Sequence, residues 1–224
     1  MDYQTLLKGV KLYKKLSFDK SYKKYVLNRR QIWENLDQIT ENEVKNTIIG
    51  FLKAWGIRNT NRIKPHELKE SLKGLNKRFK ILRGKSLINL DFNEKVNING
   101  QKKISEVIKE IYQRLLNLNG IGSTSASKIM HCVVPEIFMM WDENIRKGYG
   151  YAGNEIGYLR FIHEMQRILR RVMETYSKSP EELIRKAYPN MNKTLTKLLD
   201  EFNYMKFTRG KKEGKDLPNP IEEL

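Results

Sequence analysis

Two glycines near the middle of the chain have the type and spacing for a chemical role. Residues 115–125 read LLNLNGIGSTS, with Gly120 and Gly122 between two apolar runs. Glycine adopts positive φ angles and lets a ligand approach the backbone closely. The amides of Gly122, Ser123 and Thr124 would then begin a helix, where free N–H groups and the helix dipole favour a phosphate. The alternative is an ordinary capping glycine in a tight turn between two helices.

An aspartate follows in residues 135–147, PEIFMMWDENIRK. A carboxylate beside a deoxyribose would stabilise the positive charge that builds when an N-glycosidic bond breaks, and it could help to activate a water molecule. The start of a helix tends to keep such an aspartate ionised. Asp142 followed by ENI is also good N-cap chemistry, which needs no catalysis. The two roles can coexist.

Helices must position these residues, because the hydrophobic period is helical along nearly the whole chain. The predicted helices are 3–16, 21–37, 41–55, a short one from Pro65 to about Leu72, 76–83, one resuming at Ser105, about 123–133, 155–176, one starting at Ser179–Pro180, and about 192–205. Residues 86–100 lack this period and are predicted to be a small hairpin or a loop. We expect an all-α domain over residues 1–212 and a loosely held tail over 213–224.

Local signals support two of these helices. Thr40 and Glu43 predict a capping box before helix 41–55, which Gly56 should end. In helix 155–176, apolar residues recur at spacings of three and four and predict one buried stripe. Its members are Ile156, Leu159, Ile162, Met165, Ile168, Leu169 and Val172.

The charge of the chain points to a polyanionic partner. Its 224 residues include 43 Lys and Arg against 26 Asp and Glu, a net charge of +17. A folded protein this basic usually meets nucleic acid. The alternative is a general enrichment in Lys, Asn and Ile in the source organism.

Cysteine and histidine usage argues against a structural metal. Cys132 is the one cysteine, so neither a disulfide framework nor a thiolate cluster for zinc or iron–sulfur is expected. The three histidines show no ligand spacing, and His131 is expected in the core or on a helix surface. No apolar run reaches membrane-spanning length, and the first residues do not form a signal peptide. We therefore expect a cytoplasmic protein without membrane contact.

The central segment resembles a known DNA-repair superfamily. Residues 118–122, LNGIG, with Ala126 four residues on, resemble the helix-hairpin-helix motif, and residues 141–146, WDENIR, are similar to the V-D-x-x-[VI]-x-R pattern of the endonuclease III-like DNA glycosylases. The likeness covers about residues 105–147, with the helix-hairpin-helix at about 105–135. It implies a two-lobed all-α fold and a hairpin that grips one strand's phosphates through backbone amides. It also implies a flipped nucleotide in a cleft between the lobes, with Asp142 as the catalytic carboxylate.

Two departures from the family pattern limit the chemistry. Bifunctional members carry the attacking lysine two residues after the second hairpin glycine, where this chain has Thr124. Lys128 lies one helical turn later and is not assumed to replace that lysine. Many members also bind an iron–sulfur cluster through four cysteines, which this chain lacks. The resemblance therefore implies monofunctional excision of a damaged or mismatched base in base excision repair, without a cofactor. A monovalent cation at the hairpin is compatible with this scheme.

The expected partner is double-stranded DNA, bound mainly through its phosphate backbone, in the nucleoid if the cell is prokaryotic. The residues expected on phosphates are Gly120, Ile121, Gly122, Ser123, Thr124, Lys128 and Arg146. Three aromatic residues, Trp55, Tyr149 and Tyr151, are candidates for stacking on a base. The tyrosines are otherwise partly buried supports, and Trp55 is otherwise a core residue. Two rival functions stay open: a non-catalytic helix-hairpin-helix module that binds nucleic acid, and a basic helical protein that binds a partner protein.

Overall fold

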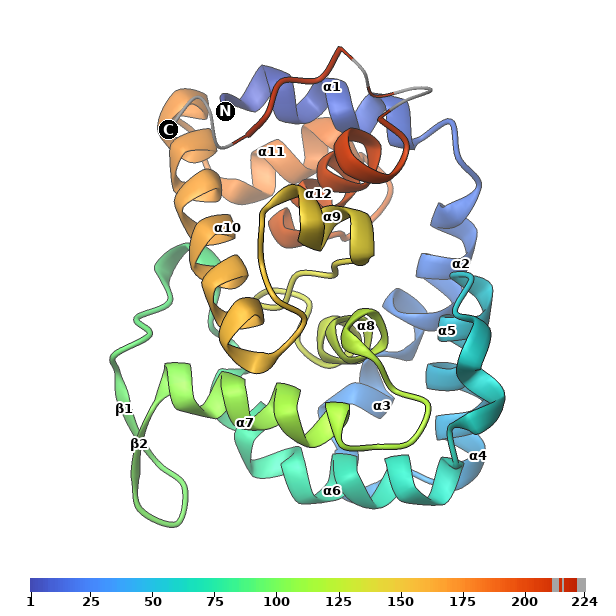
Figure 1. Ribbon diagram of the computed structural model, residues 1–224. Helices are drawn as coiled ribbons and strands as arrows, with labels where there is room; N and C mark the ends of the chain where they lie inside the picture. Colours follow the sequence, from blue (N-terminus) through green and yellow to red (C-terminus); the bar gives the residue numbers. More distant parts are fainter. Residues whose placement is uncertain (211–213, 215, 221–224) are drawn as a thin grey trace.

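The computed structural model describes residues 1–210, 214 and 216–220 (Figure 1). It confirms an all-α fold with one small antiparallel hairpin. The helices are α1 Tyr3–Tyr13, α2 Phe18–Tyr25, α3 Arg30–Glu34, α4 Glu41–Glu43, α5 Gly50–Ala54, α6 Pro65–Leu82, α7 Ile104–Leu116, α8 Ser123–Val133, α9 Glu143–Gly148, α10 Glu155–Tyr176, α11 Pro180–Ala187 and α12 Leu195–Asn203. The strands are β1 Lys95–Asn97 and β2 Gln101–Lys103.

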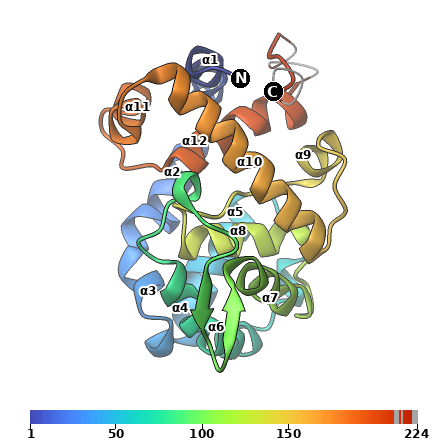
Figure 2. The same cartoon turned by 90° about the vertical axis from the view of Figure 1, so that its left-hand side faces the viewer.

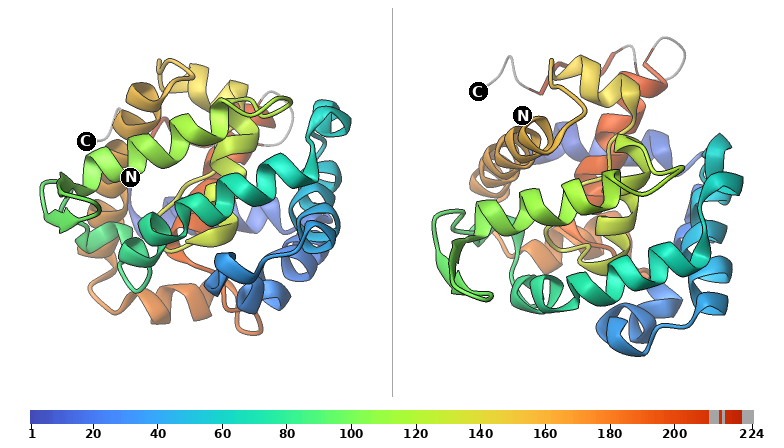
Figure 3. Two further views of the ribbon diagram at one scale, coloured as in Figure 1. Left: turned by 90° about the horizontal axis from the view of Figure 1, so that it is seen from below. Right: turned by 60° about the horizontal axis from the view of Figure 1, so that its bottom comes forward.

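The helices lie in two groups (Figure 1). One group contains α2 to α8, and the other contains α1, α9, α11 and α12. Helix α1 packs against α12, so the two ends of the helical chain lie together. Helix α10 runs from one group to the other and packs against α7, α1 and α12 (Figure 2). Seen from below, α6 and α7 lie side by side at the base of the first group (Figure 3).

Helix α10 supplies much of the core, and its predicted ends, 155 and 176, are confirmed. Six of its large apolar side chains are fully buried: Phe161, Ile162, Met165, Ile168, Leu169 and Val172. Ile156 was expected in the same stripe but is 50% exposed. Ile156 and Met165 are nine positions apart, which is about two and a half helical turns, so Ile156 projects from the opposite side of the helix.

The predicted helices 65–72 and 76–83 are one helix, α6, so that prediction was wrong. The expected interruption contains Gly74, which lies where the Arg114 guanidinium of α7 crosses α6. Glycine inside a helix costs about 1 kcal/mol relative to alanine but does not by itself end the helix. The two long helices pack at this point, and α6 continues through it.

The predicted helix 21–37 is broken instead of continuous. Helix α2 ends at Tyr25, a 3₁₀ turn covers Leu27–Arg29, and α3 ends at Glu34. The Trp33 carbonyl accepts a hydrogen bond from the Arg83 guanidinium. The carbonyl of Trp33, near the end of α3, thus has a hydrogen-bond partner outside the helix, so the helix can end there.

Local capping signals behave as predicted around α4. Thr40 accepts from the Glu43 amide at 3.2 Å, and the Glu43 carboxylate accepts from the Thr40 amide at 2.8 Å. The helical run then passes through a π-helical segment, Val44–Ile49, into α5. Gly56, with φ of 74°, follows its end. The capping box and the glycine therefore bound one continuous helical run.

The 86–100 region resolves into a 3₁₀ turn, Leu87–Asn89, and the β1–β2 hairpin, which extends to Lys103. Lys95 pairs with Lys103 and Asn97 with Gln101. Asn99 and Gly100 both have positive φ in the turn, as a tight hairpin turn requires.

The predicted tail, 213–224, lies partly outside the described residues, because 213, 215 and 221–224 are among those not described. Of the described part, Leu217 is 1% exposed, and its carbonyl accepts from the Lys206 ammonium. This portion of the tail packs on the protein.

Candidate functional site

The glycine turn between α7 and α8 has the geometry of a short hairpin. Helix α7 ends at Leu116, and the Ile121 amide donates to the Leu118 carbonyl at 3.1 Å. Gly122 is the N-cap of α8, and its carbonyl accepts from the Ala126 amide at 2.9 Å. Ile121 and Ala126 are buried, so they anchor the turn on the core.

The two glycines of this turn serve different physical needs. Gly120 has φ of 81°, and a Cβ there would lie 3.0 Å from backbone atoms of Arg62 and Ile63. Gly122 has an ordinary extended φ of −97°, is exposed, and would have nothing within 4 Å of a Cβ. The fold therefore requires a glycine at 120 but not at 122.

Helix α8 begins beside an exposed residue, Gly122. No side chain caps the first amides of α8 within the described residues, because the N-cap is a glycine. Ser123 and Thr124 are half-buried. A helix start whose amides have no side-chain cap suits an anion.

Two arginines adjoin this helix start. Arg62 is exposed and lies against Gly120. Arg146 is half-buried, and its Nε and the Ser123 hydroxyl each lie 3.6 Å from where a Cβ at Gly153 would be. One guanidinium nitrogen of Arg146 donates to the Tyr151 carbonyl at 2.9 Å, and its Nε has no partner among the described residues.

Hydrogen bonds hold the segment before Asp142 against the first turns of α8. The Trp141 indole N–H donates to the Ser123 carbonyl at 3.2 Å, and the Trp141 amide donates to the Ser127 hydroxyl at 3.2 Å. Tyr112 on α7 also reaches the Ser123 carbonyl, at 3.3 Å. The glycine turn and Asp142 are thus held in a fixed relation to each other.

Asp142 caps helix α9, as its sequence context predicted. Its Oδ1 accepts from the Ile145 amide at 2.8 Å, and its Oδ2 accepts from the Thr208 hydroxyl at 2.6 Å. Thr208 lies in a π-helical segment, Tyr204–Thr208, that continues α12. The carboxylate is half-buried.

Asp142 lines a pocket of about 50 Å³ where the two helix groups meet. Residues of both groups line it: Phe18, Trp55 and Lys128 from one, and Tyr13, Asp200 and Tyr204 from the other. A cavity of this size holds a few water molecules. A nucleobase would enter only after aromatic side chains move.

Lys128 occupies this pocket instead of the DNA-facing surface expected from the sequence. It is 8% exposed, its Nζ lies 3.5 Å from the Trp55 carbonyl oxygen, and the same atom lies 5.0 Å from the centre of the Trp55 ring. Burial lowers the pKa of Lys128 to about 8, against the opposing charges of Asp200 and Asp142. A phosphate contact by Lys128 does not fit this burial.

A buried ionic network adjoins the pocket, and sequence reasoning missed it. Asp200 lies 2.7 Å from Lys197, Lys197 lies 3.3 Å from Glu201, and Lys193 lies within 2.7 Å of both Glu201 and Asp19. Burial raises the pKa of Asp200, and the positive charge of Lys197 acts in the opposite direction and lowers it. Four of these charges lie on or just before α12 at helical spacings, a pattern typical of a solvated face. Here both faces of α12 are covered.

The three candidate stacking residues differ in access. Tyr149 is buried, and its hydroxyl donates to Asn203 Oδ1 at 2.8 Å, so it acts as a support. Tyr151 is half-buried and nearly parallel to Tyr149, with ring centres 6.5 Å apart. Trp55 is half-buried and forms a wall of the Asp142 pocket, while its indole N–H donates to Ser21 at 3.1 Å.

His131 lies in the core. Its Nδ1 donates to the Phe138 carbonyl at 2.6 Å, and its Nε2 accepts from the Tyr22 hydroxyl at 2.9 Å. In the part of the chain that the structure describes, no group of three or more His, Cys, Asp or Glu residues could hold a metal ion. Among the same residues, no helix has both the length and the apolar character needed to cross a bilayer.

Comparison with family models, curated proteins and solved structures found no match to this chain.

Proposed function

We propose that this protein binds duplex DNA through the glycine turn at 120–122 and acts as a monofunctional DNA N-glycosylase, with Asp142 as the catalytic carboxylate. The resemblance of residues 105–147 to the helix-hairpin-helix glycosylases motivates the proposal. In this scheme the turn holds the sugar–phosphate backbone, and a flipped nucleotide enters the pocket beside Asp142.

The glycine turn suits a phosphate in three respects. Its amides have no side-chain cap, Gly122 is exposed and leaves room for close approach, and Arg62 lies against Gly120. The net charge of +17 adds long-range attraction to a polyanion.

The observation that carries the proposal is the hydrogen-bonded connection between the turn and Asp142. Trp141 is tied to Ser123 and Ser127 of α8, immediately before Asp142. A backbone phosphate held at the start of α8 would therefore lie in a fixed position relative to the carboxylate. Catalysis depends on such fixed positioning.

The pocket must enlarge before a base can enter. Phe18, Trp55 and Tyr204 line it and are half-buried, so their rings can swing without exposing the central core. In the enlarged pocket, Trp55 would offer a face for stacking on the base. The Asp142 charge would stabilise the oxocarbenium-like transition state.

The test is a panel of duplexes, each with one damaged or mismatched base, incubated with wild type and with Asp142→Asn. Strand cleavage after alkali treatment measures base release. Asparagine keeps an oxygen for the Ile145 amide but removes the charge. We expect base release to fall roughly 100-fold or more while duplex affinity changes less than about twofold.

Release by the variant at the wild-type rate would refute the role of Asp142. Circular dichroism and thermal unfolding of both proteins establish that the fold is unchanged. Tight, salt-sensitive binding without release from any duplex would favour the second candidate below.

A non-catalytic DNA-binding module is the second candidate. Two observations favour it. Both carboxylate oxygens of Asp142 already accept hydrogen bonds, and the pocket beside Asp142, of about 50 Å³, is too small for a nucleobase. In this reading Asp142 is an N-cap that stabilises α9, and the glycine turn is the functional feature.

A further inference from the structure

Two stretches of the chain that contain no acidic residue meet at the glycine turn. Residues 44–66 and 111–135 have no Asp or Glu, although the whole chain has 26 of them. The stretches touch where the backbone of Arg62 and Ile63 lies against Gly120, since a Cβ there would be 3.0 Å from it. The positive charges on these stretches therefore have no acidic neighbour along the chain to offset them.

Arg58 and Arg62 carry two of these charges. They begin and end a kinked 3₁₀ segment that follows α5. Thr60, in its middle, is 5% exposed, whereas both arginines are exposed. Neither arginine has an ion pair or a side-chain hydrogen bond within the part of the chain described, and the next acid, Glu67, lies 2.8 Å from Lys64. A buried neighbour thus anchors the backbone of this segment, and two unpaired guanidinium groups extend from it.

The same part of the chain connects the glycine turn with the Asp142 pocket. Trp55 lines that pocket, and its carbonyl oxygen lies 3.5 Å from the Nζ of Lys128, in the second turn of α8. Arg62, seven residues later, lies against the glycine turn just before α8. Residues 55–62 therefore run beside the start of α8. A DNA strand held at the turn and reaching the pocket would lie close to both arginines.

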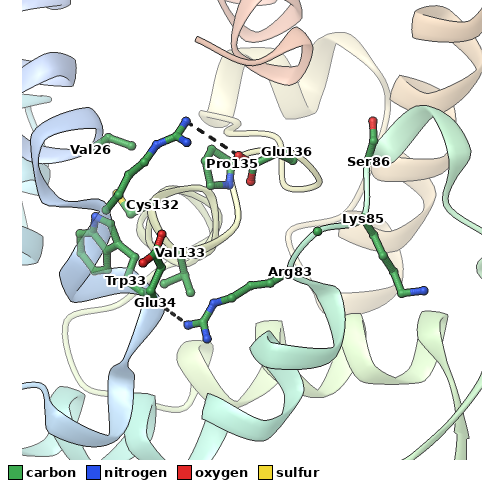
Figure 4. A pocket seen from close by; sticks show the side chains of 12 residues that line it. Val26, Trp33, Glu34, Arg83, Lys85, Ser86, Cys132, Val133, Pro135 and Glu136 are labelled. Carbon is green, nitrogen blue, oxygen red and sulfur yellow. Dashed lines mark hydrogen bonds and ion pairs between the residues drawn. The ribbon is translucent and has the colours of Figure 1, made fainter. Parts of the chain in front are cut away.

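At the opposite end of α8, two cations lie beside carboxylates. Arg30 lies 3.9 Å from Glu136, and Lys85 lies 2.8 Å from Glu94, around a cavity of about 300 Å³ (Figure 4). A cation beside a carboxylate adds little net charge to its surroundings. The unpaired arginines therefore distinguish the end of α8 that carries the glycine turn.

We propose that Arg58 and Arg62 form a second phosphate-binding surface, which holds the DNA backbone next to the phosphate at the glycine turn. This inference rests on the DNA binding proposed above and does not depend on catalysis by Asp142. Each guanidinium neutralises one phosphate and releases its counterions. Phosphate contacts carry no sequence information, so the surface adds affinity for any duplex.

The test measures how duplex affinity depends on salt, by fluorescence anisotropy with an undamaged duplex. Wild type, Arg58→Gln, Arg62→Gln and the double variant are titrated between about 50 and 200 mM salt. The slope of log affinity against log salt concentration is about −0.9 for each phosphate neutralised on B-DNA. Each single variant should therefore make the slope shallower by about 0.9, and the double variant by about 1.8.

Two further variants serve as controls. Arg30→Gln removes an exposed arginine that already has a carboxylate beside it, at the other end of α8, and should keep the wild-type slope. Arg62→Lys keeps the charge and should also keep it, which separates the charge from any structural role of the side chain. Circular dichroism and thermal unfolding establish that each variant is folded.

The outcomes separate this surface from the proposed function. A wild-type slope in both glutamine variants would overturn the surface and leave the glycine turn as the DNA site. An equal change in Arg30→Gln would also overturn it, because net charge alone would then explain the effect. Wild type that binds no duplex at about 50 mM salt would reject the proposed function and this surface together.

Discussion

At the scale of single residues, the glycine turn offers a test in which stability and binding move in opposite directions. Gly122 is the N-cap of α8 in extended conformation with free space around it. Aspartate is among the best N-cap residues, so Gly122→Asp should stabilise the protein slightly or leave it unchanged. The new carboxylate would occupy the amides and repel phosphate. We expect duplex affinity to fall about tenfold or more.

Gly122→Asn is the matched control, because asparagine caps helices equally well without a charge. It should bind duplex more tightly than Gly122→Asp and less tightly than wild type. Filter binding or fluorescence anisotropy measures affinity, and thermal unfolding measures stability. Wild-type affinity in the aspartate variant would exclude the turn as a phosphate site.

Lys128 has a consequence for stability that depends on pH. Burial lowers its pKa to about 8, below the ordinary value of 10.5. The unfolded chain therefore holds this proton more tightly, and the contribution of Lys128 to the free energy of unfolding rises with pH between about 8 and 10.5. Below about pH 8 Lys128 is charged in the folded protein, so burial of its charge lowers the free energy of unfolding by the full amount.

Lys128→Met removes that cost. The free energy of unfolding at pH 7 should increase by about 1–3 kcal/mol, a range that allows for the counter-charge lost to Asp200. The gain should shrink as the pH approaches 10.5. Urea unfolding of both proteins at pH 7 and pH 10 measures it, and a gain that is the same at both values would show that charge is not its cause.

The sequence predicted those site residues whose role is local. The glycine turn and the Asp142 cap depend on neighbours within a few positions, and both are present. Thr208 and Asp200 were missed because distant parts of the chain bring them to Asp142. The burial of Lys128 was missed for the same reason, since its position in α8 fixes its face but not what covers that face.

At the scale of elements, α6 contains a glycine whose replacement should stabilise it. The three atoms nearest to a Cβ at Gly74 all belong to the end of the Arg114 side chain, and Arg114 is exposed and can move. Gly74→Ala should therefore raise the free energy of unfolding by about 0.5–1 kcal/mol. Chemical denaturation measures the change. A loss of stability would show that the Arg114 guanidinium is fixed in place.

Elements with a strong period and clear caps were predicted closely, and elements shaped by packing were not. The ends of α8 and α10 match their predicted ranges. The end of α3 at Glu34 has no comparable signal, because Arg83, at the C-cap of α6, satisfies the Trp33 carbonyl. A hydrogen bond between segments that far apart is invisible to any local pattern.

At the scale of the whole molecule, the contact between α1 and α12 joins the two ends of the helical chain. Gly9 permits this approach, since a Cβ there would lie 3.1 Å from the Phe202 Cα, a backbone atom that cannot turn aside. Gly9→Val would force the helices apart and should lower the free energy of unfolding by about 1–3 kcal/mol. Lys8→Val, at the exposed neighbouring position, is the control and should change it little. Equal losses in both variants would mean that helix propensity, not the contact, is responsible.

The α1–α12 contact also constrains how the protein is made. Helix α1 leaves the ribosome early, whereas the surface that covers it is synthesised only with α12. Until then its buried residues, including Leu6 and Val10, have only part of their final packing, which α10 and α11 supply before α12 is made. Such long-range closure is slow and leaves apolar surface open to aggregation during synthesis. A nascent chain arrested before α12 should consequently depend on chaperones that hold exposed apolar helices.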